Sequence, residues 1–128
     1  MKYNPQKTDG KPYKQMAGKM SKNWKGGLKQ VVTNNIDGKR HPVTVQRWNR
    51  ERGFHPTQKP VAMFEYFIAT YTDKNDIVLD PFMGSGTTGM ACKKLDREFI
   101  GIEMMPEYME IAKCRIDGVK KEDQLNML

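Results

Sequence analysis

The sequence predicts an α/β protein in which an incomplete parallel sheet with flanking helices follows a basic, mostly irregular segment. Three observations indicate this fold class. An apolar, β-prone run at Ile77 to Leu79 is followed directly by the glycine-rich stretch Asp80 to Thr88, and a helical pattern then extends from Gly89 to Leu95. A second strand is expected at Phe99 to Glu103. This order of strand, turn, helix and strand is typical of a parallel sheet.

The first strand and its turn suit a small charged ligand. A uniformly apolar strand is expected to be buried on both faces, and Asp80 stands at its carboxyl end, where open α/β sheets bind ligands. Gly84 and Gly86 can adopt positive φ and allow close approach of the backbone. The free N–H groups of the following helix favour a negative group. Hydroxyls for capping or binding come from Ser85, Thr87 and Thr88.

Two further helices are expected around this unit. Helical spacing of apolar residues runs from Val61 to Ala69, with Thr57 as a candidate cap and Pro60 in the first turn. A last helix is expected to begin at Pro106 and to end at Gly118. Its core-facing side is expected to consist of Tyr108, Ile111, Ala112 and Cys114.

The second expected strand ends in an acid, which indicates a ligand that carries a ribose. In nucleotide-binding α/β units an acid at this place accepts hydrogen bonds from ribose hydroxyls, so Glu103 is a candidate ribose ligand. Gly84 to Gly89 also matches the pattern G-x-G-x-x-G. This pattern alone does not distinguish a nicotinamide cofactor from another adenosine ligand.

The segments before and after the turn decide between these ligands. His55 to Pro60, Asp80 to Thr88 and Ile100 to Glu103, in this order, resemble motifs of the amino-group DNA methyltransferases that use S-adenosylmethionine. The resemblance extends more weakly into the amino-terminal part, through Tyr3 to Gln6 and His41 to Val45. It covers most of the chain and makes a dehydrogenase the minor alternative.

The resemblance implies roles for individual residues. Asp80 and the turn would surround the methionine part of the cofactor, Glu103 would hold the ribose, and the Thr57 and Lys59 region would lie against the methionine carboxylate. For Met104 and Met105, core packing is expected rather than contact with adenine, and for His55 a structural or capping role rather than catalysis. The expected cofactor-binding residues are Thr57, Lys59, Asp80, Phe82, Gly84, Ser85, Gly86, Thr87 and Glu103.

The implied reaction is methyl transfer to an exocyclic amino group of DNA, adenine rather than cytosine, as in restriction–modification. Family members perform it with an Asp-Pro-Pro-Tyr-type segment, which orients a flipped base. No such segment occurs in the sequence, so no catalytic residue is assigned. We therefore expect a carboxyl-terminal, cofactor-binding half that needs a complementing polypeptide or a homodimer. The alternative is an inactive remnant that binds DNA or cofactor.

The chain is expected to have three regions, and its basic charge is concentrated before residue 60. Residues 1–54 form a basic segment resembling a target-recognition region, residues 55–119 the S-adenosylmethionine-binding unit, and residues 120–128 a polar tail. Residues 1–60 hold 14 Lys and Arg against three acids. This segment is expected to contact phosphates of double-stranded DNA, although a solvated lysine-rich arm explains it too. The expected DNA-contacting residues are Lys14, Lys19, Lys22, Lys25 and Lys29, with Tyr13 and Trp24 among them.

The two cysteines indicate neither a metal site nor a catalytic thiol. Cys92 and Cys114 lack CxxC spacing and a histidine partner, so both are expected to be buried free thiols. The sequence shows no secretory leader and no apolar run of membrane-spanning length. A cytoplasmic location, in a prokaryotic or phage-type system, is therefore expected, without a membrane partner.

Overall fold

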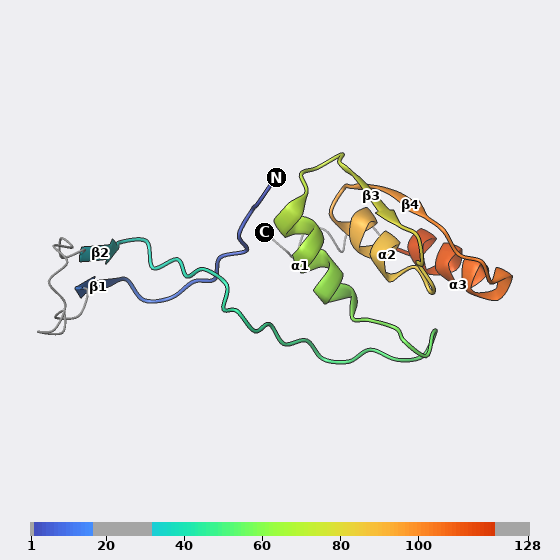
Figure 1. Cartoon of the computed structure of the whole chain (residues 1–128), viewed down its shortest axis with the longest axis horizontal. Helices are drawn as coiled ribbons and strands as arrows, with labels where there is room; N and C mark the ends of the chain where they lie inside the picture. Colours follow the sequence, from blue (N-terminus) through green and yellow to red (C-terminus); the bar gives the residue numbers. More distant parts are fainter. Residues whose placement is uncertain (1, 17–31, 120–128) are drawn as a thin grey trace, which may run out of the picture. The chain divides into compact units, whose positions relative to one another are not determined.

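The computed structural model describes residues 2–16 and 32–119 (Figure 1). Contacts divide these residues into two compact units, one spanning Lys7–Thr44 and the other comprising residues 2–6 and 45–119. The expected tail at 120–128 lies outside the described residues. None of the helices in the described ranges is long and apolar enough to cross a membrane.

The Lys7–Thr44 unit contains a short antiparallel ladder where an irregular segment was expected. Strand β1 (Tyr13–Met16) pairs with β2 (Val32–Asn35), and Tyr13 lies opposite Asn35. The guanidinium of Arg40 lies 4.3 Å from the centre of the Tyr13 ring. Apart from these two strands, whose side chains are mainly exposed and polar, the described residues before 55 are irregular, as expected.

The second unit has the element order that the sequence predicts. Helix α1 (Val61–Tyr71) precedes β3 (Ile77–Asp80), α2 (Thr87–Lys94), β4 (Glu98–Gly101) and α3 (Pro106–Asp117). The two strands are parallel and joined by α2, which packs against α1, α3 and β4 (Figure 1). The described residues thus form a small α/β unit with three helices and a two-stranded parallel sheet.

Several element boundaries differ from the sequence predictions, and three of the differences involve residues that the sequence singled out. Helix α1 is capped by the extended backbone of Pro60 without a side-chain hydrogen bond, so Thr57 is not its cap. Helix α2 begins at Thr87, two residues before Gly89. Strand β4 ends at Gly101, so Glu103 lies beyond the strand. The predicted start of α3 at Pro106 is confirmed.

The core lies between the helices and one face of the sheet. Its buried residues come from α1 and α2, and Val78 and Phe99 pack against them from the two strands. Ala91 and Cys92 are fully buried, and burial raises the pKa of the Cys92 thiol to about 11. Cys114 is exposed, so the expectation that both thiols are buried is wrong for Cys114.

The opposite face of the sheet is apolar and exposed. Ile77 and Leu79 of β3 are 67% and 60% exposed, and Ile100 and Ile102 are 52% and 55% exposed. Among the described residues β3 has β4 as its only strand partner. The prediction of a strand buried on both faces is therefore wrong for this chain, because only the face bearing Val78 is covered by helices.

A buried ion pair joins the first two helices. Nζ of Lys94, at the end of α2, lies 3.0 Å from Oε1 of Glu65 on α1. Only 9% of the Glu65 side chain and 25% of the Lys94 side chain are exposed. The pair therefore fixes α1 against α2 in a place where neither charge is well hydrated.

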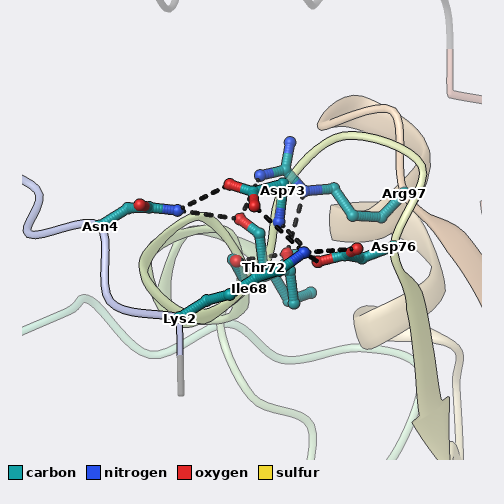
Figure 2. Close-up of polar contacts among 7 residues, drawn as sticks. All are labelled: Lys2, Asn4, Ile68, Thr72, Asp73, Asp76 and Arg97. Carbon is teal, nitrogen blue, oxygen red and sulfur yellow. Dashed lines mark hydrogen bonds and ion pairs between the residues drawn. The ribbon is translucent and has the colours of Figure 1, made fainter.

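The first residues of the chain are tied to the connection between α1 and β3 (Figure 2). Lys2 Nζ donates to both carboxylate oxygens of Asp76 at 2.8 and 2.7 Å, and lies 3.1 Å from Oδ2 of Asp73. Asn4 donates from its backbone N–H to the carbonyl of Thr70 at 2.6 Å. Arg97 reaches the same connection from the other side, through Thr72. Residues 2–6 thus pack with the α/β unit.

Candidate cofactor site

A pocket of about 100 Å³ lies between the turn after β3 and the segment before α1. Seven of the nine cofactor-binding residues predicted from the sequence line it, and Gly86 and Glu103 are the two that do not. Two segments about 20 residues apart in the sequence thus meet in one place. The pocket is lined by His55, Thr57, Gln58, Lys59, Phe64, Asp80, Phe82, Met83, Gly84, Ser85, Thr87 and Thr88.

Asp80 organises the turn from the end of β3. Its Oδ1 accepts a hydrogen bond from the backbone N–H of Phe82 at 3.0 Å, and its Oδ2 accepts one from the hydroxyl of Thr88. The carboxylate therefore ties the start of the turn to the first turn of α2. Phe82 itself is 87% exposed, and its ring is free to cover a ligand.

Glu103 reaches the same turn from beyond β4. Its Oε1 accepts from the backbone N–H of Met105 at 2.8 Å and its Oε2 from that of Gly84 at 2.9 Å. These bonds, with that of Met105 the stronger influence, hold the pKa of the Glu103 carboxyl below its usual value. The side chain is thus an anion beside the turn, although it does not line the pocket.

The two glycines have different physical functions. Gly86 has φ of +77°, and a Cβ there would lie 2.8 Å from Cβ of Ala112 on α3. Gly84 has φ of +51°, but a Cβ there would meet only the ring of His55, at an ordinary 3.6 Å. Gly86 therefore seats the turn against α3, whereas Gly84 places a backbone N–H toward Glu103.

Arg115 supports the turn and was not predicted from the sequence. From α3 its Nη1 donates to the carbonyl and to the hydroxyl of Ser85, at 2.5 and 2.8 Å. Its guanidinium also lies 4.7 Å from the centre of the Phe54 ring. No local pattern marks this arginine, because its role depends on how α3 packs.

The segment before α1 forms the other wall. Nδ1 of His55 accepts from the backbone N–H of Thr57 at 3.2 Å, and the ring lies 4.3 Å from that of Tyr108. Lys59 donates from Nζ to the carbonyl of Thr57 at 3.0 Å. His55 is thus a packed residue with a local hydrogen bond, and the Lys59 ammonium stands at the rim of the pocket.

Two methionines next to Glu103 are more exposed than the sequence predicts. Met104 is 88% exposed and Met105 is 44% exposed. The expectation that both belong to the core is therefore wrong. Lys14 is exposed on β1, and the other four predicted DNA contacts, Lys19, Lys22, Lys25 and Lys29, lie outside the described residues.

The geometry defines a class of protein, an α/β protein with a glycine turn and two carboxylates at the ends of parallel strands. A family model described as "DNA methylase" matches residues 1–114 of the chain. The chain therefore belongs to the N6/N4 DNA methylase family. Members of this family use S-adenosylmethionine. The match includes both walls of the pocket and Glu103.

The relatives are type II methyltransferases of bacteria. The chain is 49% identical over 71 residues to M2.MboI of Moraxella bovis, covering 56% of this chain and 26% of that protein. It is 52% identical over 70 residues to M.HpaI of Haemophilus parainfluenzae, covering 55% and 22%. The chain thus spans about a quarter of the length of these relatives. A solved structure, the M1.HpyAVI complex with S-adenosylmethionine, is 63% identical over 48% of this chain and 32% of that chain, with a TM-score of 0.47.

Proposed function

We propose that this chain is the cofactor-binding part of a DNA methyltransferase that transfers a methyl group from S-adenosylmethionine to an exocyclic base amino group. The observation that carries the proposal is the pocket, which joins the His55 to Pro60 segment to the turn after Asp80. Family membership supplies the cofactor class. We propose adenine rather than cytosine as the target base. We also propose that the protein acts inside a bacterial cell, where its DNA substrate is found.

The chemistry of the lining suits the cofactor. The Lys59 ammonium and the free N–H groups at the start of α2 complement the methionine carboxylate. The Glu103 carboxylate accepts backbone hydrogen bonds from Gly84 and Met105 and a further one from Met104, and a carboxylate has about four acceptor sites, so it can still accept from a ribose hydroxyl. Exposed Phe82 and Met104 flank the turn and offer apolar surface to an adenine ring. S-adenosylmethionine supplies a sulfonium methyl group for inline displacement.

The pocket and the sheet both support an incomplete site. Ligand pockets usually enclose roughly 300–1,000 Å³, whereas this pocket measures about 100 Å³. The exposed apolar face at Leu79 and Ile100 is of a kind that α/β sheets normally cover. We therefore propose that residues outside these 128, on a complementing polypeptide, complete the site and supply the Asp-Pro-Pro-Tyr-type segment. Association of two copies could cover the exposed sheet face but would not add that segment.

In this reaction the residues of this chain would mainly bind and orient the cofactor. The base nitrogen would form a bond to the methyl carbon as the sulfur–methyl bond breaks, with S-adenosylhomocysteine as the leaving group, and the amino proton would pass to water or to a residue of the completing segment. Positioning of the two reactants supplies most of the rate gain for such a displacement. The turn at Asp80 and the carboxylate of Glu103 would hold the donor, and the completing segment would orient the base.

The basic segment would add affinity for the DNA backbone. Lys14 is exposed on β1, and the proposed contacts also include Lys19, Lys22, Lys25 and Lys29. Such phosphate contacts are independent of sequence and sensitive to salt. Affinity for nonspecific duplex DNA should therefore fall steeply as the salt concentration rises. An affinity that does not change with salt would show that these lysines do not contact phosphates and serve only as a solvated surface.

A methylation assay tests the proposal. Labelled S-adenosylmethionine and adenine-containing duplex DNA are incubated with the chain alone, and then with the chain mixed with the product of the adjacent upstream reading frame. Methyl transfer to adenine is expected only from the mixture, and an Asp80→Ala chain should fail to support it. Activity from the chain alone would refute the need for completion. Cofactor binding without transfer in either sample would favour the alternative, an inactive binding remnant.

A further inference from the structure

A second, larger hollow lies beside the cofactor pocket. It measures about 630 Å³ and is lined by Arg50, Arg52, Gly53, Phe54, His55 and Pro56. None of these residues except His55 lines the cofactor pocket. The hollow is therefore a distinct feature of the same unit, and two of its six lining residues carry a full positive charge.

The two arginines are not neutralised by the acid between them. Glu51 is half-buried, and its Oε1 accepts a hydrogen bond from the backbone N–H of Val61 at 3.1 Å, at the start of α1. Its carboxylate thus occupies a helix N-terminus, where a negative charge is favourable. Arg50 and Arg52 are exposed, and neither forms an ion pair within residues 2–16 and 32–119.

The segment that bears the arginines is held in place on both sides. Before them, the ring of Trp48 lies 5.7 Å from that of Tyr66 and 5.8 Å from that of Phe67, both on α1. After them, the backbone N–H of Phe54 donates to the side-chain oxygen of buried Gln58 at 3.1 Å. Two long cationic side chains therefore project from a backbone that packing has already fixed, which lowers the entropic cost of binding an anion.

His55 connects this hollow to the cofactor pocket. Its ring lines both, and Nε2 lies 3.7 Å from the position that a Cβ on Gly84 would occupy. Because Nδ1 accepts the Thr57 hydrogen bond, Nε2 carries the proton of the neutral ring. A ligand in the hollow would thus lie one imidazole ring away from the turn that is proposed to hold the methyl donor.

We propose that Arg50 and Arg52 bind a phosphodiester of the DNA backbone and so position the substrate strand beside the cofactor pocket. Guanidinium groups match phosphate oxygens with paired hydrogen bonds. The main competing anion is the cofactor carboxylate, for which the proposed site lies with Lys59 on the other side of His55. The inference rests on the proposed function, because it takes the ligand to be the DNA of that reaction.

Binding of a fluorescent nonspecific duplex by the full chain, followed by anisotropy over a salt series, tests the proposal. The Arg50→Gln/Arg52→Gln variant is expected to bind about tenfold or more weakly. The slope of log affinity against log salt should fall in magnitude by about 1 to 2. The Arg50→Lys/Arg52→Lys variant keeps both charges and should retain most of the slope. Both arginines are exposed, so a circular dichroism melt should show an unchanged fold.

A control variant that loses the same amount of charge distinguishes a specific phosphate site from general electrostatic attraction between the chain and DNA. Lys74 and Lys113 are exposed and paired with Asp96 and Glu110, and the Lys74→Gln/Lys113→Gln chain should retain nearly the wild-type slope. An equal loss in this control, or an unchanged slope in the arginine variant, would overturn the proposal. A selective loss of S-adenosylmethionine affinity in the arginine variant, measured by calorimetry, would assign the hollow to the cofactor instead. If the wild-type chain binds no duplex, this inference fails, while cofactor binding and complemented methylation still test the proposed function.

Discussion

Replacing Glu103 by Gln keeps the size of the side chain but removes its charge and one acceptor oxygen. In the structure both oxygens accept backbone N–H groups, from Met105 at 2.8 Å and from Gly84 at 2.9 Å. An amide can serve only one of these donors well, because its nitrogen is itself a donor. Glu103→Gln should therefore loosen the link between the turn and the end of β4, and remove the charge available to ribose hydroxyls.

The expected effect on cofactor binding is large enough to measure. Hydrogen bonds to a charged group are worth roughly 10- to 150-fold in an equilibrium constant. Glu103→Gln should thus weaken S-adenosylmethionine binding by about 10- to 100-fold, which calorimetry resolves. Asp80→Ala should also weaken it, because Asp80 ties Phe82 to the start of α2.

The pH dependence of that difference has a definite sign. Hydrogen bonds from Met105 and Gly84 lower the pKa of Glu103 from its ordinary 4.5. The carboxylate is therefore ionised at neutral pH, and its contribution is lost only as pH falls through the lowered pKa. The affinity difference between wild type and Glu103→Gln should persist down to about pH 4.5 and shrink below it.

A matched control is available in the first turn of α3, four residues after Glu103. Glu107 is an exposed acid in the first turn of that helix, and Glu107→Gln removes the same charge without touching the turn. Its S-adenosylmethionine affinity should equal that of the wild type. Unchanged affinity in Glu103→Gln would refute the assignment of Glu103 as a cofactor ligand. Equal losses in both variants would show a general charge effect instead.

Three further predictions concern stability and assembly. In urea titrations, Gly86→Ala should lower the free energy of unfolding by about 2–4 kcal/mol, because the new side chain has a positive φ and also overpacks against α3. Gly84→Ala has the positive φ without that clash and should lower it by only about 1–2 kcal/mol. Lys2→Met should lower the melting temperature at pH 7, and this difference should shrink as pH falls below about 3.8. Lys2 lowers the pKa values of Asp73 and Asp76, so its contribution is lost as pH falls through those lowered values; a difference that stays constant over that range would contradict this. Leu79→Thr should change the stability of the isolated chain by less than about 0.5 kcal/mol, because Leu79 is 60% exposed, yet it should reduce methyl transfer by the complemented enzyme. Full activity of that variant would argue against docking on this face.

The α/β unit could be predicted because its signals are local. An apolar run, a glycine turn and a proline at Pro106 determine where β3, α2 and α3 lie, and the structure has all three. Strands β1 and β2 were not predicted, because Tyr13–Met16 and Val32–Asn35 lack apolar alternation and expose most of their side chains. Their pairing joins residues that are 16 positions apart at the nearest register pair, Met16 and Val32, and 22 apart at the farthest, Tyr13 and Asn35.

Burial is the property that the sequence predicts least well here. The apolar side chains of Ile77 and Leu79 predict a strand covered on both faces, but both side chains are exposed in the structure. Met104 and Met105 were also expected in the core because they are apolar, and they too are exposed. In the candidate site, seven of the lining residues were predicted as cofactor ligands, because the two motifs are local in the sequence. Arg115 was not predicted, because its contact with Ser85 arises only when α3 packs against the turn.

The ion pair between Glu65 and Lys94 has a consequence for how the pocket meets its ligand. One wall of the pocket immediately precedes α1 and the other immediately precedes α2, so the angle between the two helices sets the width of the opening. The core residues Val61, Ile68, Ala91 and Cys92 are buried between the same two helices, so separating the helices would expose this core as well as break the ion pair. The walls are thus held at a fixed spacing before any ligand arrives, and a ligand that matches this spacing binds without first having to order them.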